Sequence, residues 1–231
     1  MRIWRAGPGW LIAALLSVPI LSPLAVAGKS ESGFTYYQKL TGDDSDSDKS
    51  KWDSLYSKSK DYVFGKEPAV SLVENLNLFP VGRVLDIAMG EGRNSVYMAK
   101  KGFDVTGVDI SEVAVRKARR LAKENKVHFK AVVADLTKYQ IAPESYNVIM
   151  VFYYLQRSLN PAIIRGLKPG GVLIYENYTK GQTKYDKAEN ADYLLNKDEL
   201  RTMFKGLETV KYQELDSGKE VFATLIARKP K

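Results

Sequence analysis

The sequence predicts an α/β fold built on a doubly wound sheet that is mostly parallel and ends in an antiparallel hairpin. From about residue 52 onward, short apolar runs of strand length alternate with amphipathic stretches of helical length. Parallel neighbours need a crossover, usually a helix, so this alternation indicates helices on both faces of a parallel sheet. Near the C-terminus, two β-rich runs flank Asp216, Ser217, Gly218 and Lys219, which are typical of a hairpin turn. We see no internal repeat and no second domain.

Seven strands are expected, each a run of apolar and β-branched residues bounded by turn-forming residues. The expected strands are 83–87, 104–110, 127–135, 146–152, 172–176, 209–215 and 220–227. The sequence LKPGG, residues 167–171, predicts a turn before the fifth strand because it joins a proline to two glycines.

Four helices are expected, because each candidate begins or ends on a residue with capping chemistry. The expected helices are 94–102, which stops at Gly102; 111–126, with Ser111 as its N-cap; 160–167, opened by Asn160 and Pro161; and 196–204, with a capping-box-like start from Asn196 and Glu199.

The first 27 residues do not belong to the predicted fold. Arg2 and Arg5 precede an apolar run that ends in Ala-Val-Ala at Ala27, which is typical of a signal peptide cleaved after that residue. An uncleaved membrane anchor is the alternative. With either, the positive-inside rule predicts export to the periplasm or the exterior, and a cytoplasmic location follows only if the segment is not used.

Residues 28–51 are polar and of low complexity, so they predict a flexible linker ahead of a domain at 52–231. Trp52 and Tyr56 stand at the start of that domain. They either fold over a ligand site as a lid or pack against the sheet, and the sequence leaves both open.

Composition excludes several chemistries. The chain has no cysteine and one histidine, so it has no disulfide, thiolate nucleophile or Cys-ligated metal, and no metal site is expected. The formal charge is +8, but the lysines are scattered rather than grouped with aromatic residues. Nucleic acid is therefore an unlikely partner. The sequence does not determine the oligomeric state.

The stretch VLDIAMGEGRN, residues 84–94, joins the first strand to a helix. Ligands of open parallel sheets lie beyond the carboxyl ends of such strands. A pyrophosphate-binding loop needs glycine where Ser95 stands, and Asp86 and Glu91 add carboxylates that repel phosphate, at ~4 Å by on the order of a few kcal/mol. The carboxylates suit a cationic ligand without phosphate. S-adenosylmethionine, with a sulfonium and an ammonium, fits this description.

Acids also end the next two strands. Asp109 is placed to accept both ribose hydroxyls, and Asp135 to meet an adenine amino group. Ile110 and Leu136 follow these acids and are placed to sandwich the base. The expected cofactor-binding residues are Asp86, Ala88, Gly90, Gly92, Asp109, Ile110, Asp135, Leu136 and Phe152.

These motifs carry a family resemblance. VLDIAMGEGRN, VTGVDIS, ADL and LKPGGVLIYE resemble the class I S-adenosylmethionine-dependent methyltransferases, which implies a Rossmann-like sheet. More narrowly, KWDSLY, FGKEP and GEGRNSVYMAKKGFDVTGVDIS look like the branch of tellurite-resistance methyltransferases and their thiol- or chalcogen-methylating relatives. The resemblance implies a small, soft or anionic methyl acceptor. The chain departs from the branch at Gln156, where a histidine is frequent, and at Met89, where a cysteine or small residue is frequent.

Tyr153 and Arg157, after the fourth strand, are the candidate catalytic residues. Arg157 either holds an anionic acceptor bidentately or pairs with a surface acid, and Tyr153 either lines the acceptor pocket or packs under a helix. Arg93 pairs with an acid or reaches the acceptor. Glu176 and Tyr178, after the fifth strand, are placed to border the same site.

Three functions stay open from the sequence. The first is methyl transfer to a small acceptor. The second is an exported protein that binds S-adenosylmethionine without turnover, since the cofactor is made in the cytosol and the N-terminus predicts export. The third is a protein or nucleic-acid methyltransferase, suggested by the positive charge. The absence of an Asn/Asp-Pro-Pro-Tyr/Phe motif and of cysteine favours the first over the third.

Overall fold

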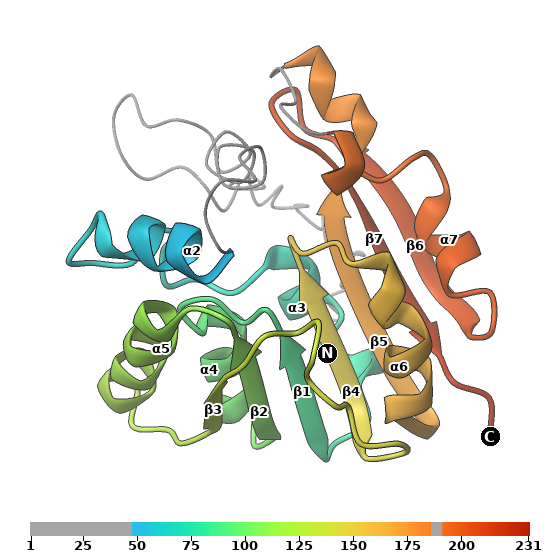
Figure 1. Ribbon diagram of the computed structural model, residues 1–231. Coiled ribbons are helices and arrows are strands. Elements are labelled where there is room, and N and C mark those ends of the chain that lie inside the picture. The colour runs from blue at the N-terminus through green and yellow to red at the C-terminus, as the bar shows by residue number, and fades with distance from the viewer. Residues whose placement is uncertain (1–47, 186–190) are drawn as a thin grey trace, which may run out of the picture.

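The computed structural model describes residues 48–185 and 191–231, so the expected signal segment and most of the expected linker lie outside the described residues. Its centre is a seven-stranded sheet with the strand order β3-β2-β1-β4-β5-β7-β6 (Figure 1). The strands are β1 Arg83–Ile87, β2 Asp104–Asp109, β3 Lys130–Val133, β4 Tyr146–Phe152, β5 Leu167–Tyr178, β6 Glu208–Asp216 and β7 Val221–Arg228.

The strand directions confirm the predicted fold class. The first five strands run parallel, and β7 pairs antiparallel with both β5 and β6. Strand β1 pairs with β2 on one side and with β4 on the other, so the chain changes winding direction between β1 and β4. In such sheets the ligand crevice opens at the carboxyl ends of the two strands at that switch point.

The described helices are mostly short. They are α2 Asp48–Ser57, α3 Val70–Glu74, η1 Leu76–Leu78, α4 Arg93–Lys100, α5 Glu112–Glu124, η2 Arg157–Leu159, α6 Asn160–Gly166, η3 Lys180–Lys184, η4 Ala191–Tyr193 and α7 Glu199–Met203. Within the part of the chain that the structure describes, no helix is both long and apolar enough to cross a bilayer.

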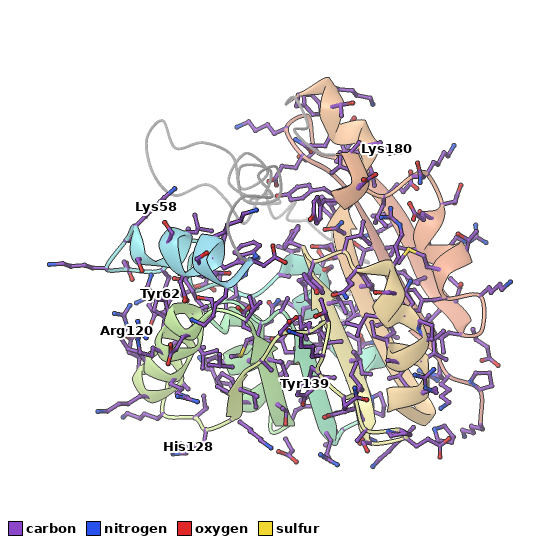
Figure 2. All side chains as sticks on the ribbon, in the orientation of Figure 1. Lys58, Tyr62, Arg120, His128, Tyr139 and Lys180 are labelled. Atoms are coloured by element: carbon purple, nitrogen blue, oxygen red, sulfur yellow. The ribbon has the colours of Figure 1, made fainter. Side chains whose placement is uncertain are left out.

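Both faces of the sheet are buried, as expected for a parallel sheet covered by helices, and side chains fill the space between the sheet and the helices (Figure 2). Along β1, Leu85 and Ile87 enter a core that also contains Ile163 of α6 and Leu200 of α7. The alternate residues of the strand face the opposite core, with Met98 of α4. Alternation of side chains along the strand therefore anchors helices on both faces and fixes where the loop after β1 emerges.

Some expected boundaries are wrong. Strand β3 begins only at Lys130, because its pairing with β2 starts there, opposite Thr106. The expected turn at 167–171 lies inside β5, which extends back to pair Leu167 with Tyr146. Asn160 does not cap α6, since it already has helical torsions and makes no side-chain cap bond. Each error arises where tertiary pairing, rather than local propensity, sets the end of an element.

Helix α2 lies across the end of the sheet at which the parallel strands finish, next to α5 (Figure 1). Residues 48–51 belong to this helix, although the sequence places them in the linker. Ser111 caps α5 as predicted, since its Oγ accepts the backbone N–H of Ala114 at 3.1 Å. The same hydroxyl donates to Oδ1 of Asp53 at 2.6 Å, which ties α2 to the start of α5.

Candidate active site

A cavity opens beyond the carboxyl ends of the parallel strands, beneath α2. Its walls come from α2, from the segment that follows it, and from the strand ends and the loops after them. The lining residues are Asp48, Trp52, Tyr56, Phe64, Gly65, Asp86, Ala88, Met89, Gly90, Glu91, Arg93, Asn94, Asp109, Ile110, Asp135, Leu136, Thr137, Phe152, Tyr153, Tyr154 and Tyr178.

Most of the residues expected from the sequence meet in this cavity. Those that line it are Asp86, Ala88, Gly90, Asp109, Ile110, Asp135, Leu136, Phe152 and Tyr153. Gly92 and Arg157 do not line it. The acids at the ends of β1 and β2 and after β3 therefore face one common crevice, as the strand-end argument requires.

The turn after β1 lines the cavity in part with residues that have small or no side chains. Ala88 and Gly90 both have φ of 55°, in the left-handed region that glycine tolerates best. The N–H of Gly90 donates to Oδ2 of Asp109 at 2.8 Å, which fixes the turn against β2. A Cβ at position 90 would lie 2.9 Å from Oη of Tyr56, so only glycine leaves room under α2.

Asp86 is a buried carboxylate at the base of the cavity. It is 2% exposed, and its Oδ2 accepts the hydroxyl of Ser95 at 2.7 Å. Burial is the main reason that the pKa of Asp86 is raised to about 7. The hydroxyl of Ser95 acts to lower this pKa, and the nearby charge of Asp109 acts to raise it. A cation that enters the cavity would stabilise the ionised form of this carboxyl group.

Asp109 is the second buried carboxylate and is 6% exposed. Burial raises its pKa to about 6, although the N–H groups of Ser111 and Gly90 act in the opposite direction. Its Oδ1 accepts the Ser111 N–H at 2.8 Å. Two carboxylates that titrate near neutrality suit a cationic ligand, and the donor set fits S-adenosylmethionine.

Asp135 differs from the other two acids because it is only partly buried. The hydroxyl and the N–H of Thr137 both donate to its Oδ1, at 2.6 and 2.9 Å. The Thr137 hydroxyl is the main reason that the pKa of Asp135 lies below its ordinary value. Leu136 is buried beside it, and Ile110 is partly buried at the end of β2, so both supply apolar wall.

Gly92 does not line the cavity, although the sequence predicts that it approaches the ligand. Gly92 precedes α4 with φ of 83°, and a Cβ there would lie 2.7 Å from Cβ of Ala118 in α5. Its glycine is therefore needed for the close packing of two helices rather than for the cavity.

The expectation that Arg157 holds the acceptor is also wrong. Its Nε donates to Oε1 of Glu199 at 2.6 Å, and its Nη1 donates to the carbonyl of Asp192 at 2.7 Å. Its Nη2 donates to the carbonyl of Leu194 and to Glu199, both at 3.2 Å. The guanidinium therefore joins η2 to the segment 192–199 and does not itself line the cavity, which is the pairing with an acid that the sequence left as the alternative.

Glu91 does not face a ligand as a free charge. It is buried, forms an ion pair with Nζ of Lys117 at 2.8 Å, and its Oε2 accepts the N–H of Val63 at 2.7 Å and that of Phe64 at 3.2 Å. Its carboxylate therefore fastens the segment after α2 over the cavity. The sequence carries no local signal of this role, because Val63 and Phe64 lie far from Glu91 along the chain.

Helix α2 forms a roof over the cavity. Trp52 and Tyr56 stack with ring centroids 5.8 Å apart, and both line the cavity. Burial alone raises the pKa of Asp53, but the Lys49 ammonium and the Ser111 hydroxyl outweigh it and hold that pKa at about 2. Asp53 is thus ionised at neutral pH and keeps its bonds to α5. Asp48 and Phe64 also line the cavity, and the sequence did not anticipate either.

Another part of the cavity lining is aromatic and carries one cation. Tyr153 and Tyr178 pack with ring centroids 5.1 Å apart. The guanidinium of Arg93 lies 6.0 Å from the Tyr153 ring centroid, and its Nη1 donates to the carbonyl of Phe64 at 3.1 Å. Burial raises the pKa of Tyr153 well above its usual range, so the phenol stays protonated at neutral pH.

Comparison with known proteins agrees with this geometry. A family described as "Methyltransferase domain" matches residues 84–171, from β1 into β5. The "Probable S-adenosyl-L-methionine-dependent methyltransferase TehB" of Haemophilus influenzae is 25% identical over 196 residues, covering 76% of this chain and 68% of that relative. A "Ubiquinone biosynthesis O-methyltransferase" of Pseudomonas savastanoi is 30% identical over 122 residues, covering 49% of this chain and 52% of that relative.

Solved structures show the same fold. The crystal structure of TehB from Haemophilus influenzae aligns with a TM-score of 0.62 at 20% identity, covering 77% of this chain and 67% of that one. Motifs, sheet topology and sequence relatives thus converge. The chain is an S-adenosylmethionine-dependent methyltransferase, and it resembles the class I enzymes of this kind and, among them, the TehB branch.

Proposed function

We propose that this enzyme methylates a small, soft or anionic acceptor, such as a thiol or a chalcogen oxyanion, inside the cavity under α2. In the cofactor half, Asp109 and Asp135 hold the nucleoside between Ile110 and Leu136, and Asp86 lies at the base of the same crevice. The bare backbone at Gly90 permits close approach. The cofactor supplies an electrophilic methyl group on a sulfonium.

One observation carries the acceptor assignment: Arg93 is the only lysine or arginine among the lining residues of the described structure. It lies beside the aromatic pair Tyr153 and Tyr178. A guanidinium in an otherwise acidic and aromatic cavity binds an anionic acceptor, and the rings exclude water from it. A soft nucleophile then needs little beyond positioning and desolvation.

The roof favours a small acceptor over a macromolecule. Asp53 and Glu91 fasten α2 and the segment after it across the cavity. An acceptor therefore has to fit beneath Trp52 and Tyr56. Relatives named for ubiquinone and for phosphoethanolamine methylation are also similar in sequence to this chain, so that similarity does not select the acceptor. The acceptor proposal rests on the cavity of this chain.

The first test measures cofactor binding by calorimetry. Wild-type protein should bind S-adenosylmethionine, and Asp109→Asn should weaken binding by about 100-fold, because the variant cannot become anionic against the ribose. Asp104→Asn is the matched control, since its carboxylate is exposed at the opposite end of β2. Equal affinity of the wild type and Asp109→Asn would contradict the assignment of the crevice.

The second test measures methyl transfer to a panel of thiols, selenite and tellurite. Arg93→Met should raise KM for anionic acceptors about tenfold or more while cofactor binding is retained. Arg165→Met removes an exposed arginine on α6 and should change neither. Turnover of a protein or nucleic acid, with none of the small acceptors methylated, would overturn the proposal.

We also propose that residues 1–27 direct export, on the sequence pattern alone. Mass measurement of the N-terminus after cell fractionation tests this. A chain that keeps Met1 in the cytosol would contradict it.

A further inference from the structure

Glu176 is a buried carboxylate behind the aromatic wall of the cavity. It is 3% exposed and does not itself line the cavity. Its Oε1 accepts the hydroxyl of Tyr153 at 2.9 Å, and its Oε2 accepts the hydroxyl of Thr224 at 2.7 Å. Among the described residues, no lysine or arginine forms an ion pair with it. A buried acid held by two hydroxyl groups and no cation is costly for the fold, so its place beside the site is informative.

The register of the sheet builds this cluster. Glu176 pairs with Phe152 on β4 and with Thr224 on β7, so the two hydroxyl donors come from strands on either side of β5. Tyr153 follows β4 directly, and its N–H donates to the carbonyl of Glu176 at 2.8 Å. Tyr153 has φ of 55°, a strained conformation for a tyrosine. This strained residue is one of those that line the cavity.

Tyr153 is the connection between the cavity and the carboxylate. Its side chain lines the cavity, and its hydroxyl donates inward to Glu176. The Tyr153 residue therefore stands between the cavity and the buried carboxylate of Glu176. The guanidinium of Arg93 lies 6.0 Å from the centroid of the same ring.

We propose that Tyr153 and Glu176 form a proton relay that activates an acceptor arriving in its protonated form, namely a thiol. This inference rests on the proposed small-acceptor function and narrows its substrate class. The S–H bond of the thiol breaks and its proton passes to Oη of Tyr153, while the Tyr153 proton passes to Oε1 of Glu176. The sulfur electron pair forms the new bond to the methyl carbon, and the C–S bond of the sulfonium breaks with its electron pair left on the departing sulfur.

The products are a methyl thioether, neutral S-adenosylhomocysteine and protonated Glu176, which returns its proton to water through the same path. The relay is useful at neutral pH because the thiolate is the nucleophile, whereas an ordinary thiol ionises only near pH 8.5. An acceptor that is already ionised gains nothing from it. Tyr153 is the catalytic residue of this pair, and Glu176 acts through it.

The test compares two thiols of different acidity at saturating S-adenosylmethionine. 2-Mercaptoethanol is protonated in neutral buffer, whereas 4-nitrothiophenol is already ionised. Glu176→Gln keeps the shape of the side chain and removes the base, and Tyr153→Phe removes the hydroxyl. Each should lower kcat/KM for 2-mercaptoethanol by about 100-fold and for 4-nitrothiophenol by less than about threefold.

The pH profile gives a readout that a structural role would not move. In Glu176→Gln, turnover of 2-mercaptoethanol should rise about tenfold per pH unit below pH 8.5, following the thiolate fraction, while the wild type depends on pH more weakly. Tyr212→Phe is the matched control, because Tyr212 also donates to a glutamate, Glu214, but on the exposed strand β6. It should change neither thiol.

Two outcomes overturn the relay. Equal losses on both thiols in Glu176→Gln and Tyr153→Phe, with unchanged pH profiles, would assign the pair a structural role while leaving the small-acceptor function intact. If the wild type binds S-adenosylmethionine and methylates neither thiol, the relay falls together with the thiol as acceptor. Calorimetric titration of the cofactor and thermal melting of each variant separate both outcomes from misfolding.

Discussion

On the assignment proposed above, the cavity has a cofactor half and an acceptor half, and the two are built in different ways. The cofactor half comes from β1, β2 and β3 and from the residues that directly follow them, and its geometry depends on backbone turns and strand-end acids. The acceptor half is assembled from α2, the start of α4 and the ends of β4 and β5, through side-chain contacts such as that between Tyr153 and Glu176. The first half is local in sequence, and the second is not.

The family match covers the proposed cofactor half in full and the proposed acceptor half only in part. It spans 84–171, which includes Arg93 and Tyr153 and ends before Glu176. Helix α2 and Tyr178 lie outside it. We therefore expect acceptor choice to depend on α2 and Tyr178 as well as on Arg93.

The largest expected effect comes from a substitution that disrupts the packing of α4 against α5, next to the cofactor half. Gly92→Ala should lower the free energy of unfolding by about 2–4 kcal/mol, because the new Cβ meets Ala118 in a left-handed backbone conformation. Gly102→Ala has a similar φ of 86° and nothing within 4 Å, so it should cost only about 1 kcal/mol. Urea denaturation of both variants isolates the steric overlap, and equal losses would show that backbone strain alone is responsible.

The second expected effect is a pH dependence of cofactor affinity that arises in the cofactor half and not in the acceptor half. The pKa values of Asp86 and Asp109, about 7 and about 6, lie in the neutral range, whereas burial keeps Tyr153 protonated there. A cationic cofactor needs both carboxylates ionised, so its affinity should fall about tenfold per unit from pH 7 to 6 and about 100-fold per unit below about 6. Calorimetry between pH 5 and 8 measures this. An affinity that does not change across that range would show that these acids do not hold the cofactor.

The same two acids should make the stability of the cofactor-free protein fall with rising pH, whereas cofactor affinity should rise with pH. Their folded pKa values are raised from 3.8, so the stability that their protonation contributes is present below about pH 4 and is lost as pH rises through about 7. Without cofactor, melting temperature should therefore fall across this window from these groups, and saturating cofactor should reverse part of the loss. Asp109→Asn should weaken the pH dependence.

The smallest expected effect concerns Arg157, outside both halves. Its guanidinium is partly exposed, with 41% of the side chain accessible, so its pair with Glu199 is screened by solvent. Arg157→Met should cost about 1 kcal/mol of stability and leave kcat/KM within about twofold of the wild type. A large rise in KM for an anionic acceptor would move the acceptor site toward Arg157 and away from Arg93.

The sequence alone predicted the fold class and the cofactor, and it named most of the residues that line the cavity beyond the first three strands. It did so because apolar periodicity, the glycine turn and the acids at strand ends are all local patterns, and parallel strands bring their carboxyl ends to one edge. It did not separate Gly92 from the lining residues, because a glycine needed where α4 approaches α5 looks the same in sequence as one needed where a ligand approaches.

Only the tertiary structure decided which charged side chains are committed elsewhere. Glu91 pairs with Lys117 and holds the segment after α2, Arg157 pairs with Glu199, and among the described lining residues Arg93 alone brings a positive charge to the cavity. The neighbours of a side chain come from segments far apart along the chain, and hydrogen bonds and ion pairs act over only a few ångströms. For that reason the sequence determined that acids gather at one edge of the sheet, and the packing determined which side chains face the cavity there.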